Sequence, residues 1–116
     1  MGERTVRRML LEIGHGTDLH GADYTKAAVR AVKDALQRCS LNFLAALGID
    51  PQEMQVAVTI GAQAPDQVVS GAVAEVFPYG TVTVQVVPGG LDIPGERGGD
   101  RAVVATAAIV VSCPLP

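Results

Sequence analysis

The chain has 116 residues, of which 48% are hydrophobic and 3% aromatic, and its net charge is −3. This length fits a single domain over residues 1–116, with a core built from Val, Ala, Leu and Ile. The acidic balance argues against a nucleic-acid partner, because nucleic-acid-binding domains are usually basic. No apolar run approaches the roughly 20 residues of a membrane span. Residues 1–8 lack the apolar core of a signal peptide, so we expect no membrane partner and a cytoplasmic location.

The spacing of apolar residues predicts the elements in chain order. These are a strand over 7–13, a helix over 23–38 with one or two further turns over 40–47, a strand over 54–60, a helix from Pro65 to about Val76, a strand over 81–87 and a strand over 101–112. Residues 88–100 hold five glycines and two prolines and are predicted to form a long loop, which acts as a lid or as an arm between subunits. Its charges have both signs and come from Asp92, Glu96, Arg97, Asp100 and, at its end, Arg101.

The order β-α-β-α-β-β predicts an α+β fold, a two-layer sandwich in which two helices cover one face of a mixed four-stranded sheet. The helix-covered face is expected to carry Val56, Val58, Ile60, Val82, Val84 and Val86. The other face is expected to carry Leu10, Glu12, Gln55, Ala57, Thr59, Thr81, Thr83, Gln85 and one side of the last strand. A solvated face normally alternates to charged residues. We therefore expect other subunits to bury this second face in a homo-oligomer.

The segment Gly14-His15-Gly16-Thr17-Asp18-Leu19-His20-Gly21 follows the first predicted strand and precedes the first predicted helix. Ligands often bind at such a strand end, because the following helix N-terminus offers free N–H groups. Glycine lets a ligand approach the backbone closely, so Gly14, Gly16 and Gly21 are candidate ligand-binding residues. The spacing differs from that of the dinucleotide fingerprint, and the sequence indicates no cofactor.

His20 is the first candidate catalytic residue, because histidine titrates near neutral pH and acts as acid, base or metal ligand. Asp18 lies two residues away and can orient the ring of His20. The alternative is structural: Asp18 caps the helix or binds its own loop backbone. His15, Asp18 and His20 together also resemble an incomplete metal site, but three residues at this spacing are a weak signal, and we predict no metal.

Lys26 is the other candidate catalytic residue, because a cation in the first turn of a helix opposes the helix dipole. Arg30 lies one turn later, and the two side chains can clamp a carboxylate or phosphate of a small polar or anionic metabolite. The alternative is a solvated helix face with a pair between Arg30 and Asp34. Tyr79 is a candidate for lining a cleft in this aromatic-poor chain, and packing of its own turn is the alternative.

The pattern Gly14-x-Gly16-x-Asp18-x-His20-Gly21 resembles the GxGxDxHG motif of a conserved hypothetical family of bacterial and plant proteins, the Lin-type family. The resemblance extends over most of the chain. It includes Thr25-Lys26-Ala27-Ala28-x-Arg30-Ala31, Ile60-Gly61, Pro65, Phe77-Pro78-Tyr79-Gly80, Gly89-Gly90-Leu91 and Gly99-Asp100. The family has no established activity, so this resemblance implies membership and no reaction.

The element order also resembles the fold of the small trimeric chorismate mutases. That resemblance implies sheets packed around a trimer axis, with sites between subunits. The chemistry does not follow, because the last predicted strand holds no arginine after Arg101. We expect an oligomeric small-metabolite enzyme with an intersubunit site on residues 14–21. The alternative is a homo-oligomer without catalysis, either a small-molecule-binding module or a structural protein.

Overall fold

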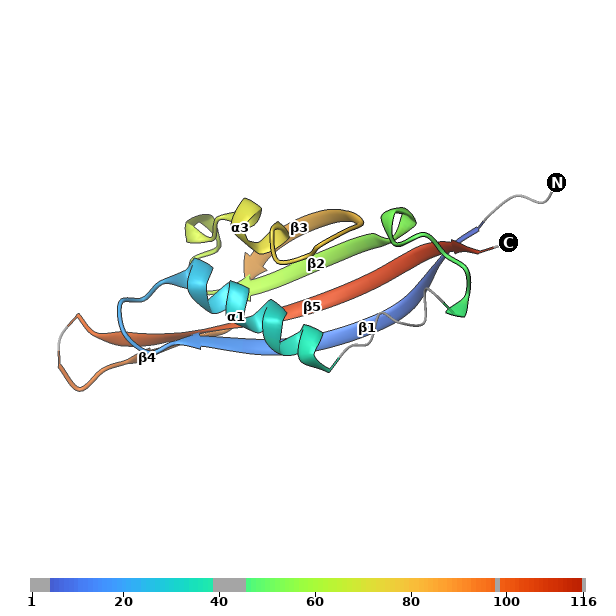
Figure 1. Cartoon of the computed structure of the whole chain (residues 1–116). Coiled ribbons are helices and arrows are strands. Elements are labelled where there is room, and N and C mark those ends of the chain that lie inside the picture. The colour runs from blue at the N-terminus through green and yellow to red at the C-terminus, as the bar shows by residue number, and fades with distance from the viewer. Residues whose placement is uncertain (1–4, 39–45, 98, 116) are drawn as a thin grey trace.

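The chain forms one long twisted sheet with its helices on one side, as the computed structural model shows (Figure 1). The structure describes residues 5–38, 46–97 and 99–115. Its elements are β1 (Thr5–Asp18), α1 (Tyr24–Gln37), the 3-10 turn η1 (Pro51–Glu53), β2 (Gln55–Ala62), the 3-10 turn η2 (Pro65–Gln67), α3 (Ser70–Ala74), β3 (Thr81–Pro88), β4 (Leu91–Pro94) and β5 (Arg101–Leu115). Within the described ranges, no helix is long and apolar enough to cross a membrane.

β5 is the central strand, and its 15 residues span about 50 Å. β1 pairs with one side of β5 and β2 with the other, both antiparallel, and β3 adds to β2 in parallel, which gives the order β1-β5-β2-β3. The pairing of β2 with β5 ends where Gly61 faces Thr106. β4 then pairs with β5 from Leu91, which lies opposite Val104. β4 and the start of β5 therefore form a hairpin that extends the sheet beyond β2.

The predicted α+β class, with a mixed sheet and two helices, is confirmed, and the first helix and the three later strands lie close to their predicted ranges. The prediction of four strands is wrong, because Leu91–Pro94 form β4 inside the predicted loop 88–100. A four-residue strand between glycines and prolines gives too short a pattern to recognise. The further helical turns were predicted over residues 40–47; residues 39–45 lie outside the described residues, Ala46 is helical and Leu47 lies in a turn.

The single helix predicted from Pro65 to Val76 is also wrong, because the structure divides it into η2 and α3. The hydroxyl of Thr25 on α1 explains the break. It donates to the carbonyl of Gln67 at 3.2 Å and accepts from the N–H of Val69 at 2.9 Å. The backbone groups at the break are thus satisfied by a side chain from the neighbouring helix rather than by a continuing helix.

One face of the sheet packs against the helices and forms the core. The buried strand residues are Val56, Val58, Ile60, Ala62, Val103, Ala105, Ala107, Ile109, Val111 and Cys113, and Val82, Val84 and Val86 pack against them half-buried. α1 contributes Ala27, Ala28, Ala31, Val32 and Ala35 to this core. The predicted helix-covered face is therefore confirmed for β2 and β3.

The opposite side of the sheet, here called the open face, has no layer of described residues over it. Strand register and exposure place on it Leu11, Ile13, His15, Thr17, Gln55, Ala57, Thr59, Gly61, Thr81, Thr83, Gln85, Val87, Leu91, Ile93, Ala102, Val104, Thr106, Ala108, Val110 and Ser112. Four of these are large apolar side chains that are about half exposed: Leu11 at 53%, Ile13 at 47%, Leu91 at 61% and Ile93 at 51%. A face of this kind is unusual for a solvated sheet.

β1 differs from its prediction in both length and orientation. It runs to Asp18 rather than ending at residue 13, so Gly14–Asp18 belong to the strand and not to a loop. The register between β1 and β5 shifts between Arg8 and Leu10. This bulge reverses the predicted faces, because one extra residue moves every following side chain to the other side. Leu10 and Glu12 consequently lie on the helix side.

Gly14 and Gly16 allow α1 to pack directly on β1. A Cβ on Gly14 would lie 2.5 Å from the backbone nitrogen of Ala35, and a Cβ on Gly16 would lie 2.7 Å from the backbone carbon of Arg30. Both distances are far below van der Waals contact, so neither position has room for a side chain. Close approach of two backbones is a known use of glycine inside a strand. These two glycines therefore bring the helix to the strand, whereas the sequence pattern pointed to a ligand.

We expect Gly14→Ala and Gly16→Ala to lower the free energy of unfolding by about 1–3 kcal/mol or more, because the added methyl group overlaps the α1 backbone. Gly71→Ala is the matched control. Gly71 lies in α3 with no atom near its Cβ position, and alanine favours a helix by up to about 1 kcal/mol. Urea unfolding of the three variants measures the difference. Equal stability of the three variants would contradict close packing of α1 on β1.

Candidate functional site

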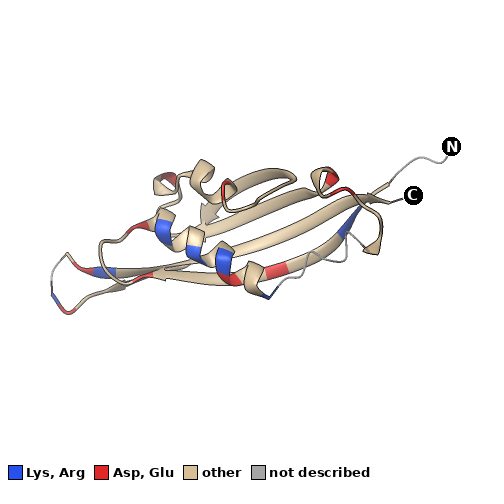
Figure 2. Ribbon diagram, in the orientation of Figure 1, with Lys and Arg blue, Asp and Glu red and all other residues tan. Residues whose placement is uncertain are grey.

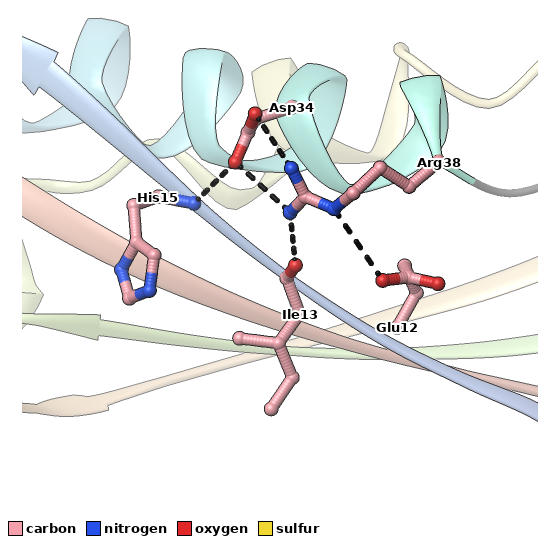
Figure 3. A network of polar contacts seen from close by, with 5 residues as sticks. All are labelled: Glu12, Ile13, His15, Asp34 and Arg38. Carbon is pink, nitrogen blue, oxygen red and sulfur yellow. Dashed lines mark hydrogen bonds and ion pairs between the residues drawn. The ribbon is translucent and has the colours of Figure 1, made fainter.

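Two side chains of α1 and that of its C-cap residue, Arg38, contact the outer backbone edge of β1. Arg30 Nη1 donates to the carbonyl of Thr17 at 2.6 Å, Asp34 accepts from the N–H of His15 at 2.9 Å, and Arg38 Nη2 donates to the carbonyl of Ile13. Arg38 and Asp34 also pair with each other at 3.1 Å (Figure 3). β1 is the edge strand of the sheet, so these backbone groups have no neighbouring strand. The helix supplies their partners instead.

β2 and β3 carry no charged residue, whereas charged side chains lie on α1, on β1, on the β4–β5 hairpin and in the loops (Figure 2). At the C-terminal end of α1, Arg38 also lies 3.6 Å from Glu12. The pKa of the Asp34 carboxyl is held below its ordinary value, first by its hydrogen bond with Arg38 and then by the N–H of His15. The charged form of Asp34 is therefore the form that joins α1 to β1.

Asp18 closes the tight loop between β1 and α1. Its carboxylate is buried, with the residue 5% exposed; Oδ2 accepts from the N–H of Asp23 at 2.9 Å, and Oδ1 lies 3.7 Å from Arg30. Asp23 in turn caps α1 by accepting from the N–H of Lys26. Gly21 has a φ of +91°, which glycine adopts without strain. The structural alternative for Asp18, binding the loop backbone, is thus the arrangement that the structure has.

His20 lies in the same loop, and its partner is Asp100 rather than Asp18. Its Nδ1 is 3.1 Å from Asp100 Oδ2, across 80 positions of sequence. The ring is largely exposed, at 81%, and Asp100 is 49% exposed. Asp100 belongs to the turn between β4 and β5. The His20 contact therefore joins the loop after β1 to the turn of the β4–β5 hairpin.

A pocket of about 320 Å³ lies along this hairpin, next to the His20–Asp100 pair. Its lining residues are Asp92, Pro94, Gly95, Arg97, Gly99, Asp100 and Arg101, and we call it the hairpin pocket. Pockets that hold small ligands usually begin at about 300 Å³. Two carboxylates and two guanidinium groups around one small pocket can bind a polar molecule by charge-assisted hydrogen bonds.

Tyr24 connects the hairpin pocket to the first turn of α1. Its hydroxyl donates to Asp92 Oδ2 at 2.5 Å, and the guanidinium of Arg101 lies over its ring, 5.9 Å from the centroid. The hydrogen bond to Asp92 is the first cause of a raised Tyr24 pKa, followed by burial and by the Asp92 charge, while Arg101 opposes them. The phenol is therefore a proton donor at neutral pH, and it fixes one oxygen of Asp92.

The structure does not bring all the predicted site residues together. Tyr79 precedes β3, at the opposite end of the sheet from His20, since β3 begins beside Gln55, which pairs with Ser112, whereas β1 ends opposite Val103. His15 lies on the open face with Nδ1 3.2 Å from the hydroxyl of Thr106. Lys26 is exposed on α1. Among the described residues, no group of three or more His, Cys, Asp or Glu is placed to hold a metal ion.

Arg30 lies on the exposed side of α1, as its structural alternative predicted, but the predicted pair with Asp34 is not formed. Its guanidinium donates to the Thr17 carbonyl and lies 3.7 Å from Asp18 Oδ1. Asp34 pairs with Arg38 instead. The guanidinium of Arg30 thus serves the connection between α1 and β1.

The residues that line the hairpin pocket were visible in the sequence only as mixed charge in a predicted loop. Asp92, Asp100 and Arg101 depend on the pairing of β4 with β5 for their positions. Tyr24 looked like an ordinary helix residue, because nothing in its neighbourhood indicates a partner 68 positions away. The only feature of the sequence that pointed to this pocket was the charged, glycine-rich segment 88–100.

Comparison with known proteins identifies a family and a similar structure. The model of a family described as conserved hypothetical protein (Lin0512_fam) matches residues 8–111. A crystal structure of an FtsZ-like protein of unknown function from Nostoc punctiforme PCC 73102 is 31% identical, with a TM-score of 0.85, over 97% of this chain and 99% of that chain. No curated protein matches the chain.

We expect Asp34→Asn to lower the melting temperature at pH 7, because it removes the charge that binds Arg38. The low pKa of Asp34 means that its ionised form stabilises the fold fully above the ordinary carboxyl pKa, and that this stabilisation is lost as the pH falls through the lowered value. The difference in melting temperature between the parent chain and the variant should therefore shrink in acid. The exposed Asp66→Asn is the control. A difference that is independent of pH would contradict this role of the charge.

Proposed function

The chain belongs to the Lin0512_fam family of conserved hypothetical proteins, and for this member we propose that it binds a small polar metabolite in the hairpin pocket. The observation that carries the proposal is the 3.1 Å contact between His20 and Asp100, which brings the 14–21 segment to the rim of the pocket. The contact is largely exposed, and exposed pairs of this kind contribute little to stability. A role toward a ligand accounts for the contact.

The charges around the pocket favour a ligand with an anionic group. Arg97 and Arg101 line the pocket, and neither has a carboxylate partner within the part of the chain that the structure describes. Guanidinium groups bind carboxylates and phosphates through paired hydrogen bonds. In this proposal Asp100 has the role that was predicted for Asp18, since it orients the ring of His20.

Catalysis with His20 as acid or base is the more specific form of this proposal, and ligand binding without turnover is its alternative. The exposure of the His20 ring favours the alternative, since acid–base catalysis works best where water is excluded. Closure of the pocket over a bound ligand, or by a neighbouring subunit, would change that exposure. Lys26 lies on the exposed side of α1 and is not among the residues that line the hairpin pocket, so its catalytic role stays a prediction.

We also propose that the open face is covered by further copies of this chain. From Leu11 to Thr17, Gln55 to Gly61, Thr81 to Val87 and Ala102 to Ser112, this face carries no Asp, Glu, Lys or Arg. Arg8, opposite Ser112, lies at its rim. A charged partner would therefore find no oppositely charged residues on this face. The face favours a partner whose surface is also apolar, such as the open face of another copy.

The size of the open face fits this partner. Four strands about 4.8 Å apart and roughly 33 Å of β5 give a flat area of about 600 Å², before Leu91 and Ile93 of the hairpin are added. Stable interfaces bury about 800 Å² on each partner. Three copies around one axis, as in the trimeric chorismate mutase-like architecture, is the assembly that we favour. In such an assembly a neighbouring copy would contact the open-face side of the β4–β5 hairpin.

Substitution at the pocket rim tests ligand binding. The probes are acetate, glutarate, glutamate and inorganic phosphate, titrated by calorimetry into the purified chain. We expect at least one probe to bind, and His20→Ala and Asp100→Asn to weaken its binding by about tenfold, the usual loss for one charge-assisted hydrogen bond. Asp50→Asn, in the cap of η1, should leave binding unchanged. Absence of binding by all four probes, or equal losses in all three variants, would overturn the proposal.

Substitution on the open face tests the assembly. We expect the parent chain to elute as an oligomer, with native mass spectrometry giving the number of copies, and Ile13→Asp or Ile93→Asp to dissociate it, since each would place a charge in an apolar interface. Val69→Asp is the matched control, because Val69 is 61% exposed and lies outside the open face. A monomeric parent chain at micromolar concentration would refute the homo-oligomer.

A further inference from the structure

Asp92 lines the hairpin pocket and has one buried carboxylate oxygen without a hydrogen-bond partner. The residue lies on β4 opposite Val103, on the side of the sheet that faces the helices, and it lines the pocket. Its Oδ2 accepts the hydrogen bond from Tyr24, a residue that is only 4% exposed. Its Oδ1 is buried and has no hydrogen-bond partner among the described residues.

An unsatisfied buried carboxylate oxygen is unfavourable, since it has lost its water without gaining a donor. Tyr24 prevents Asp92 from turning away, because its hydroxyl already holds Oδ2 and its ring is packed in the core. Arg101 is close to Tyr24, but its guanidinium lies over the ring rather than on Asp92. The free oxygen therefore belongs to a side chain that is held in place and lines the pocket, and it is an acceptor in need of a donor.

We propose that Asp92 Oδ1 accepts a hydrogen bond from a protonated amine of the ligand, while Arg101 binds a carboxylate of the same molecule. This inference rests on the proposed function, which supplies the pocket, and it narrows the ligand from any small polar molecule to an amino-acid-like one. Two carboxylates, Asp92 and Asp100, and two arginines, Arg97 and Arg101, line the pocket, and this balance matches a molecule that carries both charges.

Glutarate and glutamate test the inference, because they differ by one ammonium group. Calorimetric titration of the unmodified chain should give glutamate the higher affinity, by about tenfold, the usual gain from one hydrogen bond between charged groups. Asp92→Asn removes the negative charge and should abolish this preference without weakening the binding of glutarate, since the lost charge repels a dicarboxylate. Tyr24→Phe, which frees Oδ2 to rotate, should reduce the preference in part.

The possible outcomes separate this inference from the function on which it rests. If glutarate and glutamate bind equally well to the unmodified chain, the hairpin pocket binds anions and the role of Asp92 is refuted. If glutamate is preferred and Asp92→Asn retains that preference, the amine binds elsewhere and the inference is again refuted. If neither molecule binds but phosphate does, the inference fails while the proposed function stands. If no probe binds, both the inference and the proposed function fail. This outcome is measured on the unmodified chain, so it does not depend on whether a variant folds.

Discussion

The docking of α1 on the edge of β1 is the contact on which the rest of the structure depends. Four residues of a helix rise about 6 Å, and two residues of a strand rise about 6.8 Å. Arg30, Asp34 and Arg38, each one turn after the last, can therefore meet Thr17, His15 and Ile13 in succession along an antiparallel strand. Gly14 and Gly16 provide the short distance that these contacts need. Side chains of the helix thus bind the outward backbone groups of β1 that a further strand would otherwise bind.

This docking also determines the geometry at the hairpin end of the molecule. Because α1 is fixed along β1, its first turn lies beside β4, and Tyr24 reaches Asp92. The loop between β1 and α1 is short, so few conformations are open to it. Asp18 accepts from the N–H of Asp23, and His20 projects toward Asp100. The hairpin has two different sides. One closes the pocket with Tyr24, and the other continues the open face with Leu91 and Ile93.

Sequence patterns predicted what depends on local periodicity and missed what depends on contacts between distant segments. The apolar stripe of residues 23–38 and the alternation in residues 54–60, 81–87 and 101–112 are local, and they gave the elements and their helix-covered faces. The bulge near Arg8 is one residue without a sequence signal, yet it reversed the faces of β1. Gly14 and Gly16 are also ambiguous in the sequence, because the missing side chain allows a helix to approach the strand as readily as a ligand. Of the candidate site, His20 was predicted, whereas Asp100 and Tyr24 were not, because their roles require the β4–β5 pairing.

The helix that replaces a strand at β1 affects how the chain behaves toward other polypeptides. Aggregation by strand addition proceeds when a sheet offers free backbone groups at both of its edges, so that each added molecule presents a new edge. In this sheet the outward N–H of His15 and the carbonyls of Ile13 and Thr17 are already occupied by α1 and by Arg38 at its end, so another strand cannot pair with them. The other edges of the sheet belong to β3, to β4 and to the part of β1 before Ile13. The tight packing of two glycines under a helix thus also shortens the length of sheet edge to which another polypeptide can add.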